Sequence, residues 1–71
     1  MTALCMIDGW EKEIEIDEAP IKSGILRIPI TGPIKFAISK DDLQEENDMT
    51  TVTLYLVGQS KNSGKFIFHY R

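Results

Sequence analysis

The chain has 71 residues, one cysteine, one histidine and a formal net charge of −3. A single cysteine excludes an internal disulfide, and one histidine beside it does not supply the ligand set of a structural zinc. The length predicts one domain over residues 1–71, close to the lower limit for a core without such supports, and no cofactor is expected. No run approaches the roughly 20 apolar residues of a membrane helix. Together with the free thiol, these features predict a cytoplasmic protein that does not contact a membrane.

The first two predicted elements form a hairpin. Asp8-Gly9 separates two strand-like runs, and this pair is preferred in two-residue turns because both central positions need φ > 0. Residues 3–7 and 10–16 are therefore expected to pair as antiparallel strands.

The middle of the chain contains two shorter apolar runs. After a break at Pro20, residues 25–30 are predicted to form a short strand. Pro29 cannot donate to a ladder, which predicts an edge strand or a strand end. A turn then leads to a further expected strand over 34–38.

The segment that follows is acidic. Ser39 precedes Asp42 by three residues, which approximates a capping box, and the acids crowd the first turn. We expect either a short helix at about 40–47, anchored by Leu43, or an irregular acidic loop.

The last two elements are strands over 50–57 and 65–70, indicated by β-branched and aromatic residues. The predicted fold class is therefore mainly β, with about six short strands in a β-barrel-like or strongly curved antiparallel sheet and at most one short helix.

Charge is segregated along the chain. Residues 8–18 hold six acids and one base, and residues 41–48 hold five acids and no base. The segments 19–40 and 49–71 hold four and three bases, respectively, and no acid. Such asymmetry bears on partners and solubility rather than on fold.

The first acidic block has a regular layout. With the two-residue period of a strand, four carboxylates share one face over roughly 20 Å, whereas Ile14 and Ile16 on the other face hold the strand to a core. Trp10 opens this strand and is either part of the core or an exposed anchor for a partner. The four carboxylates belong to Glu11, Glu13, Glu15 and Asp17.

No motif indicates catalysis. The segment 58–65 has the wrong glycine spacing for a phosphate-binding loop and is interpreted as a hairpin loop. His69 and Cys5 are far apart in sequence, and a strand histidine is favoured over a Cys–His dyad. The acids of 41–48 lack the pattern of a calcium loop. We therefore expect a protein that is not an enzyme.

These features favour a binding module that contacts a basic protein surface rather than nucleic acid directly. In size, charge and absence of catalytic motifs the chain resembles the small acidic inhibitors of bacteriophages, some of which mimic DNA. The resemblance implies a module that occupies the DNA- or RNA-binding surface of a host protein such as a nucleoid-associated protein. The predicted contact residues are Trp10, Glu11, Glu13, Glu15 and Asp17, with Asp41, Asp42, Glu45, Glu46 and Asp48 as a second patch.

Three alternatives stay open at this point. The acidic face can serve solubility and discourage edge pairing. The domain can self-associate as a homodimer through 25–30 and 65–70. It can also bind single-stranded nucleic acid by stacking and phosphate contacts, although the aromatic residues are also expected in the core. The residues for that last role are Lys61, Lys65, Phe66, Phe68, Tyr70 and Arg71.

Overall fold

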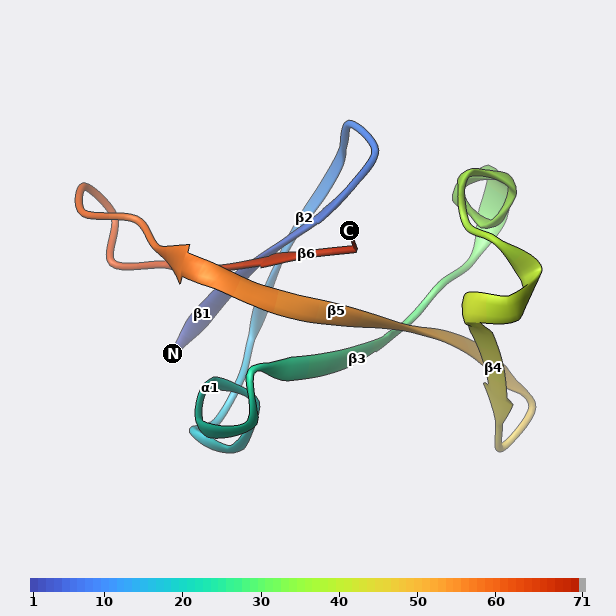
Figure 1. The fold of residues 1–71 in the computed structure, drawn as a ribbon, viewed down its shortest axis with the longest axis horizontal. Helices are drawn as coiled ribbons and strands as arrows, with labels where there is room; N and C mark the ends of the chain where they lie inside the picture. Colours follow the sequence, from blue (N-terminus) through green and yellow to red (C-terminus); the bar gives the residue numbers. More distant parts are fainter. Residues whose placement is uncertain (71) are drawn as a thin grey trace.

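The computed structural model describes residues 1–70, which form six strands of one curled, mixed sheet and three short helical segments (Figure 1). The expected fold class, mainly β with a strongly curved sheet, is confirmed. None of the helices in this described part is long and apolar enough to cross a membrane. The elements are β1 (Thr2–Ile7), β2 (Trp10–Glu15), α1 (Ala19–Ser23), β3 (Ile25–Pro29), η1 (Gly32–Ala37), η2 (Lys40–Asp42), β4 (Leu43–Glu46), β5 (Met49–Gln59) and β6 (Phe66–His69).

The predicted hairpin is confirmed. β1 and β2 pair antiparallel from Ile7 opposite Trp10 onward. The turn between them has φ of 41° at Asp8 and 87° at Gly9, the left-handed conformation that this residue pair favours.

The sheet follows the order β2-β1-β6-β5-β3, and β4 also pairs with β5. One pair departs from the antiparallel arrangement expected: β1 and β6 are parallel, so the sheet is mixed. Val52 of β5 pairs with Ile28 of β3 and with Leu43 of β4, which places β3 and β4 on opposite edges of β5. β6 pairs farther along, from Tyr55 to Gln59. β4 and β6 therefore follow one another along a single edge of β5.

The core lies inside the curl of the sheet. Alternate residues of β1, β3 and β5 point inward and are buried, as the two-residue period requires. The buried apolar residues are Ala3, Cys5, Ile7, Leu26, Ile28, Ile30, Ile38, Val52, Leu54 and Phe68.

The prediction of a strand over 34–38 is wrong. This segment belongs to the 3-10 helix η1, which Gly32 opens with φ of 79° and which has Pro33 in its first turn. In a strand, Phe36 would share the inward face of its apolar neighbours. In the 3-10 turn it points outward and is 93% exposed, whereas Ile38 is buried.

The helix considered for 40–47 is limited to one 3-10 turn, η2, followed by β4. The Ser39 hydroxyl accepts a hydrogen bond from the Asp41 amide at 3.4 Å and so caps this turn. Leu43 then pairs with Val52 and packs against the core, which favours a strand over a longer helix. Asn47 and Asp48, with φ of 49° and 65°, form the tight turn into β5.

The break expected around Pro20 is the short helix α1. Proline is tolerated in the first turn of a helix because no intrahelical N–H is needed there. Gly24 ends the helix with φ of 75°. β3 follows, lies at the end of the sheet order and ends at Pro29, which confirms the prediction for that proline.

Candidate functional site

The glutamates of β2 project from one face of the sheet. Glu11, Glu13 and Glu15 are exposed, and they stand opposite the outward residues of β1. Asp17 lies beyond the end of β2, and its carboxylate accepts a hydrogen bond from the Ala19 amide at 3.1 Å. The strand therefore carries a row of three carboxylates, and the fourth belongs to the turn before α1.

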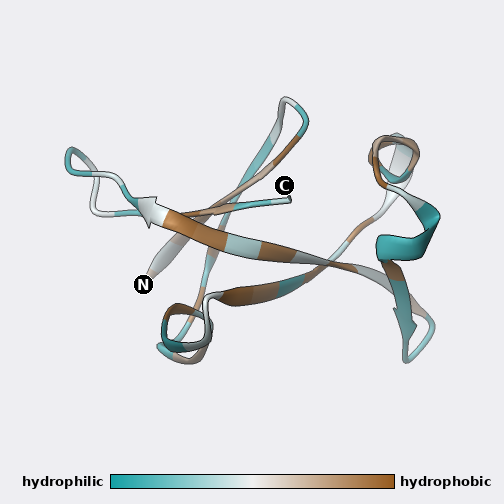
Figure 2. Cartoon of the chain, in the orientation of Figure 1, coloured by the Kyte–Doolittle hydropathy of each residue, from teal (hydrophilic) through white to brown (hydrophobic). Residues whose placement is uncertain are grey.

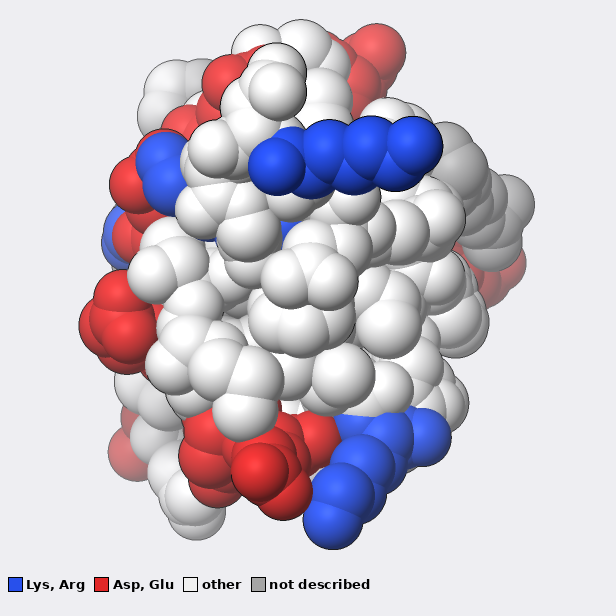
Figure 3. All heavy atoms as spheres, turned by 90° about the vertical axis from the view of Figure 1, so that its left-hand side faces the viewer, with Lys and Arg blue, Asp and Glu red and all other residues white. Residues whose placement is uncertain are grey.

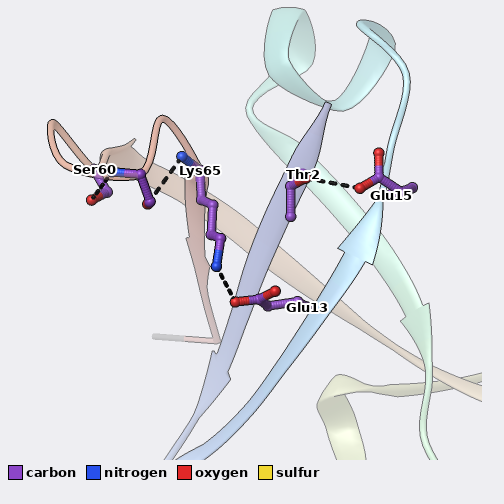
Figure 4. A network of polar contacts seen from close by, with 6 residues as sticks. Thr2, Glu13, Glu15, Ser60 and Lys65 are labelled. Carbon is purple, nitrogen blue, oxygen red and sulfur yellow. Dashed lines mark hydrogen bonds and ion pairs between the residues drawn. The ribbon is translucent and has the colours of Figure 1, made fainter.

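Two of these three glutamates have partners within the chain (Figure 4). Lys65 reaches across β1 to form an ion pair with Glu13. The Thr2 hydroxyl donates a hydrogen bond of 2.8 Å to Glu15. This bond, helped by the nearby amino group of Met1, lowers the pKa of the Glu15 carboxyl. Glu11 forms no ion pair within residues 1–70. Since Glu13 and Glu15 already have partners, Glu11 is the carboxylate of this row that is most available to another protein.

The second acidic segment is hydrophilic along η2 and β4 (Figure 2). Asp42 accepts a hydrogen bond from the Tyr70 hydroxyl, and that same hydroxyl accepts one from the Ser39 amide at 3.1 Å. Glu46 forms an ion pair of 2.5 Å with Arg27 of β3. Asp41, Glu45 and Asp48 are exposed and form no ion pair with any residue of the described chain.

A polar pocket of about 110 Å³ lies beside this second segment. It forms because β4 ends its pairing at Val52 and β6 begins at Tyr55, which leaves a gap between the two strands on the same edge of β5. Its lining residues are Asp41, Asp42, Gln44, Thr53, Tyr55 and Tyr70. Sequence reasoning missed Gln44, Thr53 and Tyr55, since a gap between strands distant in sequence has no local signal.

The two acidic blocks do not form one continuous row. β2 pairs with β1, β4 pairs with β5, and β1 and β6 lie on the path between β2 and β5. Basic side chains are also interleaved with acids on the molecular surface, as Figure 3 shows for one side. The described residues therefore do not combine both acidic blocks into one continuous row of negative charge, as imitation of a phosphate backbone would require.

The aromatic residues that the sequence predicted to contact a partner or nucleic acid pack against or within the core. Trp10 is half-buried and packs against the core, as do Phe66 and Tyr70, and Phe68 is fully buried. Base stacking on the last strand would need these rings at the surface. The described structure therefore does not offer the exposed aromatic surface that the single-strand-binding alternative requires. Arg71, the last residue named for that role, lies outside the described residues.

Cys5 and His69 lie on opposite faces of the sheet. Cys5 is buried on the inner face, where burial raises the pKa of its thiol. Its neighbour on β6 is Phe68, also buried, whereas His69 alternates to the outer face. The loop after β5 is a hairpin connection, closed by the hydrogen bond from the Ser60 amide to the Lys65 carbonyl at 2.8 Å.

Over residues 1–70, no three side chains of His, Cys, Asp or Glu gather as metal ligands would. Comparison with models of protein families, with curated proteins and with solved structures found no match for this chain.

Proposed function

We propose that this domain is a non-enzymatic, cytoplasmic binding module that docks on the basic surface of a nucleic-acid-binding protein and blocks it. The observation that carries the proposal is that four of the predicted contact residues are exposed and have carboxylates that form neither an ion pair nor a hydrogen bond with residues 1–70. β2 and the η2–β4 segment with the turn that follows it, together called the acidic segments, carry these four carboxylates. They belong to Glu11, Asp41, Glu45 and Asp48.

Their environment favours recognition of positive charge. Each lies on a paired strand, in the tight turn between β4 and β5 or in the capped turn η2, so its position varies less than that of an acid in a free loop. Complementary charge guides encounter and excludes wrong partners, and exposed pairs are weakened by salt. Binding through these carboxylates is therefore expected to weaken as ionic strength rises.

A competition experiment tests the proposal. A labelled DNA duplex is bound to a purified HU-type nucleoid protein, and the domain is added while fluorescence anisotropy reports release of the DNA. We expect release at low salt and much less at high salt. The variant Glu11→Gln/Asp41→Asn/Glu45→Gln/Asp48→Asn is expected to lose the effect.

Glu18→Gln is the control, because Glu18 is an exposed acid of the α1 region that forms an ion pair of 3.4 Å with Lys22. It is expected to compete like the original protein. Failure to release DNA from the HU-type protein, from a polymerase and from a nuclease would refute the proposal. Equal competition by the fourfold variant would refute it as well.

A further inference from the structure

The outer face of the sheet carries a row of Met, Tyr and Ile side chains with one histidine among them, called the apolar row, and acidic side chains lie near it. The strand registers place Met6 beside His69, His69 beside Tyr55, and Tyr55 beside Ile25, so four neighbouring strands contribute one residue each. In the next row Leu4 stands beside Ile67.

The side chains of this row are partly exposed to solvent. Tyr55 is 52% and Ile25 49% exposed, and Met6 is half-buried. Leu4, Met6 and Ile67 are not among the partly buried residues that pack against the core. A contiguous exposed apolar patch on a small domain marks an interaction site more often than isolated apolar residues do.

Acidic side chains near the row indicate the chemistry of a partner that could cover it. On β2, Glu11 stands directly beside Met6. Farther along the row, Tyr55 lines the pocket in the gap between β4 and β6, and Asp41 and Asp42 line the same pocket. Lys65 and Arg27 form ion pairs with Glu13 and Glu46, whereas Glu11 and Asp41 form no ion pair within residues 1–70. An apolar row with one acid beside Met6 and an acidic pocket beside Tyr55 is complementary to an apolar segment that also carries Lys or Arg side chains.

We propose that the row from Met6 through His69 and Tyr55 to Ile25 is a docking surface for a basic amphipathic segment of a partner protein. Apolar side chains of that segment cover the row, one cation lies at Glu11, and another enters the pocket beside Asp41. This inference rests on the proposed function and specifies the surface and partner chemistry that would serve it. The apolar row supplies most of the affinity, and the carboxylates set orientation.

The test uses two synthetic 14-residue probe peptides with equal numbers of lysines. In one, leucines form an apolar helical face; in the other, serines replace the leucines. Binding to the isotope-labelled domain is followed by NMR at low salt. We expect the Leu/Lys peptide to bind roughly tenfold more tightly and to shift the resonances of Met6, Tyr55 and Ile25.

Variants of the domain separate the apolar from the electrostatic contribution to peptide binding. Tyr55→Ser and Ile25→Ser are each expected to weaken binding of the Leu/Lys peptide about fivefold or more, as loss of a large apolar contact in an interface does. Phe36→Ser is the matched control, because Phe36 is 93% exposed but belongs to η1 and not to the row. It should leave affinity unchanged. Glu11→Gln and Asp41→Asn are expected to weaken both peptides.

Equal affinity for the two peptides would overturn the docking surface while leaving a purely electrostatic module in place. No binding of the Leu/Lys peptide, or equal effects of Phe36→Ser and Tyr55→Ser, would overturn it too. A dimer in light scattering that Tyr55→Ser dissociates would assign the face to a second copy, against the proposal. Peptide binding without DNA release in the competition assay would support the surface and refute only the proposed function.

Discussion

The two acidic segments each include a strand of the same sheet, yet they present their carboxylates differently. β2 alternates glutamates with other residues, so its three acids share the outer face. In β4 the acids are consecutive, so Glu45 and Glu46 point to opposite faces. A regular row thus depends on alternation and continuous pairing, whereas a run of acids on a short strand is divided between faces.

The two acidic segments also differ in the pairing and side-chain contacts that stabilise them. β2 pairs along six residues with β1, and Lys65 and Thr2 add contacts to its glutamates. β4 pairs along four residues with β5, and the preceding η2 turn depends on the Tyr70 hydroxyl. The β2 acids should therefore tolerate loss of a single partner better than the η2–β4 acids.

Replacing Tyr70 with Phe gives the largest expected effect on this comparison. The hydroxyl bonds both Asp42 and the Ser39 amide, and partly buried groups that lose a partner cost about 1–3 kcal/mol. Chemical denaturation should show this decrease in the free energy of unfolding. Tyr55→Phe is the control, because the Tyr55 hydroxyl has no hydrogen-bond partner in residues 1–70. Equal destabilisation by both variants would contradict the assigned role of Tyr70.

Replacing Lys65 with Met should have a smaller effect on β2. The ion pair with Glu13 is accessible to solvent, and such pairs contribute about 0.2–1 kcal/mol. We expect a loss within that range by denaturation at low salt, shrinking as salt screens the pair. Lys61→Met, in the same loop but without an ion pair to any described residue, should change nothing. A loss that is unaffected by salt would indicate packing of the Lys65 stem rather than charge.

The smallest expected effect concerns Glu15. Its pKa in the folded chain is lowered, chiefly by the Thr2 hydrogen bond, so folding favours the ionised carboxylate. The resulting stabilisation is present above the ordinary glutamate pKa and is lost as pH falls through the lowered value. Thr2→Val should raise the pKa of Glu15 toward the ordinary range in an NMR titration. An unchanged titration would show that another group holds the carboxylate.

Much of the fold could be predicted from particular residues. Asp8-Gly9 specified the first hairpin, and the β-branched run in β5 specified its longest strand. The Asn47-Asp48 pair was an overlooked turn signal of the same kind. Phe36 was misplaced because apolar alternation over five residues does not distinguish a strand from a 3-10 turn that begins at Gly32-Pro33.

The sequence by itself determined which residues share a face, because that depends only on the local period of a strand. It thereby placed Glu11, Glu13 and Glu15 together. Tertiary structure alone decided which strands became neighbours, including the parallel pairing of β1 with β6 and the succession of β4 and β6 along β5. Those pairings bring Lys65 to Glu13 across 52 positions, open the pocket and assemble the outer row. Contacts between distant segments depend on how the whole core packs, and no short stretch of sequence contains that information.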